Sequence, residues 1–224
     1  MKKGDFLWLL LLLSVVAILV IPSTHVVFIS LTKTHPYVMG FIKVAILATM
    51  GEFLALRIIS GKWVKPVGTF WRIVIWGFLG MAFVLVFQLF AGGVVSAIKA
   101  NLLPAFAEGS TLAAVGTAFF ISCTMNLIFA PTFMGLHRIT DTYIELCDGK
   151  LSNLKDVTLH KVVDHIDWKG LVGFVYIKTI PFFWIPAHTI TFLLPPEYRV
   201  LMASFLSIAL GGILAFAKKR SRAA

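Results

Sequence analysis

Residues 71–98 read WRIVIWGFLGMAFVLVFQLFAGGVVSAI, and no charged side chain occurs between Arg72 and Lys99. A membrane-spanning helix needs about 20 consecutive, mostly apolar residues, so this stretch is long enough to cross a bilayer. Of the 224 residues, 59% are hydrophobic and 13% are charged, whereas about 25% are charged in a typical soluble domain. The sequence therefore predicts an all-α fold, a polytopic membrane helix bundle.

Six stretches of the chain have the length and apolar character of membrane helices. The predicted spans are residues 6–31, 35–60, 71–98, 110–136, 170–193 and 195–217. We expect Pro22 to kink the first span. Residues 1–34 form a signal-anchor-like helix, expected to be retained because no clean small-x-small cleavage site follows it. Residues 35–224 form the helix bundle.

The stretch between the fourth and fifth spans is different in composition. Residues 138–169 hold six of the ten acidic side chains, interleaved with apolar residues at roughly helical spacing. This pattern is typical of an amphipathic segment lying on the membrane surface, and Trp168 would close it at interface depth.

The distribution of Lys and Arg predicts the orientation. With a cytoplasmic N-terminus, fourteen of the 20 Lys and Arg side chains fall on the cytoplasmic side and three on the outer side. Cytoplasmic loops of membrane proteins carry such an excess. We therefore expect a multi-pass protein of the cell's inner (plasma) membrane with both termini cytoplasmic. The net charge of +10 fits contact with anionic lipid headgroups better than nucleic acid binding.

Ionisable residues inside the predicted spans need a physical reason, because each costs about 2.5–3.5 kcal/mol at a helix centre. Glu52 and Lys178 lie about 12 and 13 Å from the cytoplasmic ends of their helices at 1.5 Å per residue. This match in depth predicts that they pair. Three interpretations stay open: a structural ion pair, a polar path for a solute or a proton, or a misjudged depth with the side chain extended towards the interface.

The fifth span combines helix-breaking prolines with polar side chains. Pro181 and Pro186 free backbone carbonyls that need partners, and broken helices often line transporter sites. A kinked helix packed by its neighbours is the alternative.

In the fourth span, a band of small residues at four-residue spacing continues to Asn126. Asn126 is therefore expected to face protein, either as a structural hydrogen-bonding group or as the lining of a polar cavity. The candidate intramembrane polar site is Lys43, Glu52, Asn126, Lys178, His188 and Thr189.

Motifs for catalysis, metal binding or cofactor binding were not identified in the sequence. His160 and Asp164 are four residues apart, but a metal site needs three or four converging ligands. No nucleophile elbow, zinc-protease motif or phosphate-binding loop occurs. We therefore expect a protein that is not an enzyme and that has no cofactor, no metal site and no catalytic residues.

Several short motifs over residues 35–217 resemble the Mpv/PMP family, which is named after a peroxisomal membrane protein and a mitochondrial inner-membrane relative. The motifs are His35-Pro36, Gly51-Glu52, Phe129-Ala130-Pro131-Thr132-Phe133, Trp184-Ile185-Pro186 and the run from Phe192 to Arg199. The chain departs from the family pattern at Met125-Asn126, in the Trp-Pro spacing and in having an extra first helix. The resemblance implies a small α-helical membrane protein, of bacterial type here, that forms or regulates a solute pore.

Three functions follow as hypotheses. The first is a channel or transport bundle for small solutes, of unidentified chemistry. The second is a non-conducting structural or regulatory membrane protein that acts through partners. The third is a membrane-embedded enzyme acting on lipid. Assembly into a homo-oligomer is compatible with all three.

Overall fold

The computed structural model describes residues 2–221, and within this range every regular element is helical. The elements are α1 (Lys3–Val20), α2 (Pro22–Thr34), α3 (Pro36–Ser60), α4 (Thr69–Lys99), α5 (Thr111–Leu146), a 3-10 helix η1 (Leu151–Asp156), α6 (Leu159–His165), α7 (Trp168–Gly170), a π-helix η2 (Leu171–Trp184), α8 (Ile185–Leu193) and α9 (Pro196–Ser221).

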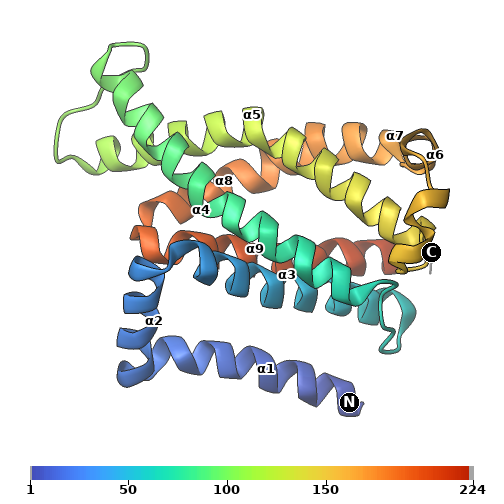
Figure 1. The fold of residues 1–224 in the computed structure, drawn as a ribbon. Helices are drawn as coiled ribbons and strands as arrows, with labels where there is room; N and C mark the ends of the chain where they lie inside the picture. Colours follow the sequence, from blue (N-terminus) through green and yellow to red (C-terminus); the bar gives the residue numbers. More distant parts are fainter. Residues whose placement is uncertain (1, 222–224) are drawn as a thin grey trace.

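Six segments are long and apolar enough to cross a membrane. They are Lys3–Val20, Pro36–Ser60, Thr69–Lys99, Thr111–Leu146, Trp168–Leu193 and Pro196–Arg220. They run side by side along one common direction (Figure 1). The predicted all-α polytopic bundle is confirmed, and the chain has the architecture of a multi-pass membrane protein.

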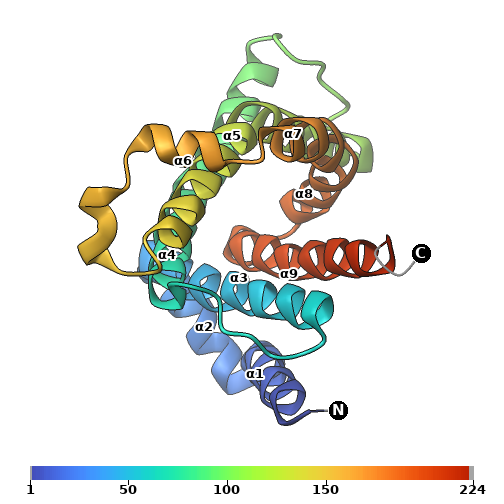
Figure 2. The ribbon, with the colours of Figure 1, turned by 90° about the vertical axis from the view of Figure 1, so that its right-hand side faces the viewer.

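Helix α3 is central to the bundle. It packs along most of its length against α4 on one side and α9 on the other, while α5 packs against α4, η2 and α8. In the end-on view these helices follow one another around an interior that is bounded by α9 and α3 below and by α5 and α8 above (Figure 2). Helix α1 lies outside α3, at the edge of the bundle.

The first predicted span is wrong in its extent. Residues 6–31 are not one kinked helix, because α1 ends at Val20 and Ile21 adopts an extended conformation (φ −75°, ψ 120°). Proline restricts the preceding residue to extended backbone, and it begins a helix readily because its missing N–H is not needed there. Pro22 accordingly starts α2, which runs across the bundle direction to join α1 to α3 (Figure 1).

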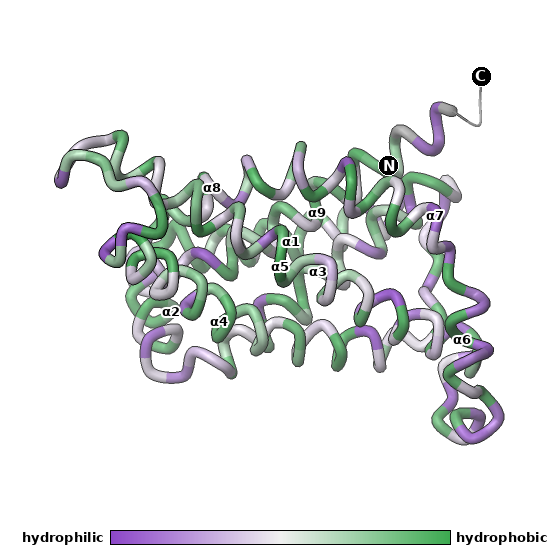
Figure 3. Tube along the Cα trace, turned by 90° about the horizontal axis from the view of Figure 1, so that it is seen from above, coloured by the Kyte–Doolittle hydropathy of each residue, from purple (hydrophilic) through white to green (hydrophobic). Residues whose placement is uncertain are grey.

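The predicted surface segment is partly wrong. Helix α5 continues through Leu146, so the first part of residues 138–169 extends a membrane-spanning helix beyond residue 136. The remainder forms η1 and α6, which lie at the end of the bundle where hydrophilic and hydrophobic residues alternate (Figure 3). Val157, Val162 and Ile166 are buried there against Cys147. An amphipathic cap therefore covers this end of α5.

The fifth span is a continuous helix of changing pitch. A π-helix continues through Pro181 and converts to α-helix at Ile185, directly before Pro186. Long π-helices are rare, and π-helical turns occur frequently at functional sites. The predicted second, third and sixth spans begin and end within a few residues of α3, α4 and α9.

Candidate functional site

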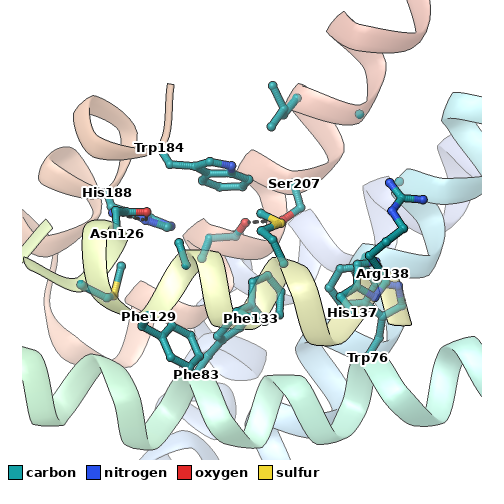
Figure 4. Close-up of a pocket in the computed structure, with 18 of the residues that line it drawn as sticks. Trp76, Phe83, Asn126, Phe129, Phe133, His137, Arg138, Trp184, His188 and Ser207 are labelled. Carbon is teal, nitrogen blue, oxygen red and sulfur yellow. Dashed lines mark hydrogen bonds between the residues drawn. The ribbon is translucent and has the colours of Figure 1, made fainter. Parts of the chain in front are cut away.

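A cavity of about 340 Å³ lies between α3, α4, α5, α8, η2 and α9. We call it the main cavity for its position between these helices, although a space of about 560 Å³ lined mostly by α1, α2 and α3 is larger. Its walls are mostly aromatic and apolar, as Figure 4 shows for Phe83, Phe129 and Phe133. Polar side chains lie at its two ends. Ligand pockets commonly combine apolar walls with a few fixed polar groups in this way.

One end of the main cavity is formed by Asn126 and His188. Asn126 is 1% exposed and its Nδ2 donates to the carbonyl of Ser122 at 2.8 Å. The Nδ1 of His188 lies 3.1 Å from Nδ2 and 3.2 Å from Oδ1 of Asn126, so one hydrogen bond joins α5 to α8 in either orientation of the amide. The hydroxyl of Ser122 donates to the carbonyl of Ile185 at 2.7 Å and reinforces this junction.

Two nitrogens at this end have no protein partner. The Nε2 of His188 and the Nε1 of Trp184 are buried and make no hydrogen bond to any residue that the structure describes. Both residues line the main cavity, and their rings stack at 5.0 Å between centroids (Figure 4). Buried polar groups are normally hydrogen-bonded. These two nitrogens are therefore unsatisfied polar atoms packed beside the cavity.

The other end of the main cavity meets a charged cluster centred on Arg72. Its guanidinium lies 2.9 Å from Asp141, 3.0 Å from Glu145 and 3.7 Å from Glu52. The Nε1 of Trp76 donates to Glu52 at 2.7 Å. Because Glu52 is on α3, Arg72 on α4 and both Asp141 and Glu145 on α5, the Arg72 cluster ties three helices together.

Within the Arg72 cluster, Glu52, His137 and Asp141 each offer a ligand atom, and these atoms lie within 4.8 Å of one another. Three such groups could hold a metal ion by spacing alone. The guanidinium of Arg72, however, already lies against both carboxylates. It supplies the positive charge that a metal would otherwise bring, so the arrangement fits an ion-pair network.

A second cavity of about 300 Å³ lies towards the end of the bundle where α3 and α9 begin. We call it the Lys43 cavity. It is lined by Thr32, Lys33, Pro36, Gly40, Lys43, Val84, Phe87, Gln88, Pro196, Glu197, Arg199 and Val200. Of the described residues, Phe87 alone lines both this cavity and the main cavity. The Phe87 side chain therefore separates the two spaces.

The structure brings some of the sequence-predicted site residues together. Glu52, Asn126 and His188 line the main cavity, and Asn126 is buried as the band of small residues predicted. Lys43 lines the second cavity instead. Thr189 lines neither, because its hydroxyl bonds the carbonyl of Ile185 one turn back at 2.8 Å.

The predicted pair of Glu52 and Lys178 is wrong. Lys178 is exposed on η2, and none of the ion pairs among the described residues includes it. Glu52 meets Arg72 and Trp76 instead. An exposed Lys on a membrane helix can extend its long side chain towards the interface, so it needs no buried counter-ion.

Sequence reasoning did not identify His137, Asp141 or Arg72 as part of the site. The predicted orientation counts Arg72, at the start of the third span, among the cytoplasmic cations, and Asp141 lies in the predicted surface segment. A usable signal was present, because His137, Asp141 and Glu145 follow one another at four-residue spacing, in register with Phe129 and Phe133 of the fourth span. Such spacing keeps side chains on one helix face.

Comparison with protein-family models, with curated proteins and with solved structures gave no match to this chain.

Proposed function

We propose that the bundle conducts small solutes through the main cavity and the Lys43 cavity, and that Phe87 closes the path between them. The observation that carries this proposal is the position of Phe87, which lines both cavities and is only 5% exposed. A single side chain at the junction of two cavities can open or close a path by changing its rotamer.

The two cavities together have the length that a path across a bilayer requires. Their linings on α9 extend from Pro196 to Leu214. At 1.5 Å per residue this separation is about 27 Å, close to the roughly 30 Å thickness of the hydrocarbon core. A solute that passed Phe87 would therefore have crossed most of the membrane's apolar layer.

Aromatic neighbours hold the Phe87 ring in the position that closes the path. Its ring centroid lies 5.3 Å from that of Phe192, 5.8 Å from that of His188 and 5.9 Å from that of Phe83. Aromatic pairs at such distances contribute about 0.5–1.5 kcal/mol each beyond area burial. This stabilisation is small enough for the Phe87 ring to leave its observed position and return to it, as a gating side chain must.

The resemblance to the Mpv/PMP family supports the same proposal. Residues that carry the resemblance line the main cavity: Gly51, Glu52, Phe129, Phe133 and Trp184. A pore-forming role is what that resemblance implies. The main cavity is where such a role would use those residues.

Liposome flux tests the proposal. Purified protein in vesicles loaded with a mixture of small polar solutes should release them slowly, and Phe87→Ala should release them faster because the constriction is removed. Phe182→Ala is the matched control, since Phe182 is 81% exposed and lines neither cavity. Release from Phe87→Ala vesicles no faster than from protein-free vesicles would contradict the proposal and favour a non-conducting role.

A further inference from the structure

We propose that the Lys43 cavity binds a small oxyanion, a carboxylate or a phosphate group. The binding groups would be Lys43 and Arg199, at the end of the bundle where α3 and α9 begin. This site could also be where solutes enter the path, and that role rests on the conduction proposed above. Binding of the oxyanion does not depend on conduction.

Lys43 is a buried ammonium group without a carboxylate partner. Its residue is 6% exposed, and its Nζ donates to the hydroxyl of Thr32 at 2.9 Å and to the backbone carbonyl of Glu197 at 3.3 Å. An ammonium group has three donors, so one is left unused. The ring of Phe28 lies 4.5 Å from this Nζ, and such a cation–π contact attracts the ammonium group but brings no negative charge to balance it. Charged groups inside membranes normally pair with one another or face water.

Arg199 is a second cation with unused donors. Its Nε donates to the carbonyl of Leu194 at 3.0 Å and its Nη2 to the carbonyl of Phe192 at 3.3 Å. A guanidinium carries five N–H donors, and these two bonds leave three available. Its planar fork matches the two oxygens of a carboxylate or phosphate, which favours an oxyanion over a halide.

The acidic side chain at this cavity, Glu197, forms no ion pair within 4.0 Å with Lys43 or Arg199. Glu197 pairs with Lys33, whose Nζ lies 3.2 Å from its Oε1. The described lining therefore contains three cations and one carboxylate, an excess of positive charge. Neither Lys43 nor Arg199 has a carboxylate oxygen within 4.0 Å among residues 2–221.

The starts of two long helices add to this positive field. Pro36 is the first residue of α3 and Pro196 the first of α9, and both line the cavity. The N-terminus of a helix carries a partial positive charge and favours anions. Two helix starts, a buried ammonium and a guanidinium thus converge on a space of about 300 Å³, enough for a small oxyanion with a few waters at roughly 30 Å³ each.

Thermal unfolding of the full chain in detergent tests this site without measuring conduction. Inorganic phosphate should raise the unfolding midpoint of the wild-type protein relative to chloride at the same ionic strength, because a ligand that binds only the folded state stabilises it. Lys43→Met and Arg199→Gln should each abolish most of this shift. Lys99→Gln is the control, since Lys99 ends α4 at the same end of the bundle but does not line the cavity.

A second arm distinguishes a free anion from a lipid headgroup. If mixed micelles with phosphatidic acid give the shift and inorganic phosphate does not, the site holds the same oxyanion chemistry as part of a lipid. If neither ligand gives a shift, or if both variants shift as far as the wild type, the site is refuted. If Lys43→Met or Arg199→Gln fails to fold, Arg199→Lys provides the test. It keeps the positive charge but loses the planar guanidinium, so phosphate should raise its unfolding midpoint less than that of the wild-type protein.

The two proposals can fail separately. Phosphate binding without solute release from Phe87→Ala vesicles would support the anion site and contradict the proposed conduction. Solute release without phosphate binding would do the reverse.

Discussion

The guanidinium of Arg72 lies 2.9 Å from the carboxylate of Asp141, which joins the start of α4 to the last third of α5. The same guanidinium reaches Glu52 on α3. The side chain of Arg72 is only 8% exposed and that of Asp141 13%, whereas that of Glu145 is 61% exposed, so the ion pair of Arg72 and Asp141 is the part of the network held away from water. This arrangement fixes the helices that form one end of the main cavity.

Arg72→Met should strongly destabilise the bundle, because it leaves Glu52 and Asp141 without their shared cation. Removing one partner of a buried pair typically costs about 3–5 kcal/mol. Thermal unfolding in detergent would measure the loss. Lys65→Met is a control, since Lys65 is exposed in the connection between α3 and α4. Equal stability of the two variants would show that the network carries no stabilisation.

The double variant Arg72→Met with Asp141→Asn should be more stable than the sum of the single losses predicts. Two groups in direct contact give coupling energies of about 0.5–3 kcal/mol in a double-mutant cycle. Glu52→Gln with Lys178→Met should instead be additive, because these residues share no contact. A large coupling in the second pair would contradict the observed placement of Lys178.

Replacing Asn126 with Leu should destabilise the protein by about 1–3 kcal/mol, since it removes the partner of a buried His188 nitrogen and leaves that nitrogen unpaired. Thermal unfolding again provides the measurement. Thr124→Val, on the same helix, removes only a hydroxyl that bonds the preceding turn. A Thr124→Val protein as unstable as Asn126→Leu would mean that the hydrogen bond to His188 contributes little.

Labelling of introduced cysteines tests the predicted orientation. In a background with Cys123 and Cys147 replaced, Lys155→Cys in η1 should react with an impermeant reagent only in inverted vesicles, because the charge distribution puts this loop on the cytoplasmic side. Glu108→Cys, in the connection between α4 and α5 at the opposite end, should show the reverse pattern. Labelling of residue 155 from outside intact cells would overturn the predicted orientation.

How much of this could be predicted from the sequence differs between the fold and the site. Hydropathy identified the spans, because a run such as that between Arg72 and Lys99 has no other stable environment than lipid. The small-residue band placed Asn126 on a protein-facing side, because close helix packing requires small side chains there. Both inferences depend only on local composition and helical spacing.

The partners of the charged residues could not be predicted in the same way. Matching depth along two helix axes does not show which faces the helices turn to each other, so Glu52 and Lys178 were paired although they do not meet. Arg72 lies near the start of a predicted span, where a cation needs no buried partner to explain it. The separation of the two cavities by Phe87 depends on how several helices pack. The sequence contains 20 phenylalanines, and no local pattern distinguishes Phe87 from the others.

The most direct test of the path is a chemical block within the main cavity. In Phe87→Ala protein lacking the native cysteines, Ser207→Cys places a thiol on α9 among the residues that line this cavity (Figure 4). A bulky thiol reagent should then stop most of the solute release from vesicles. The same reagent should leave release unchanged in the matched protein with Lys155→Cys, which lies outside both cavities. Full labelling of Ser207→Cys with undiminished release would show that solutes do not pass through the main cavity.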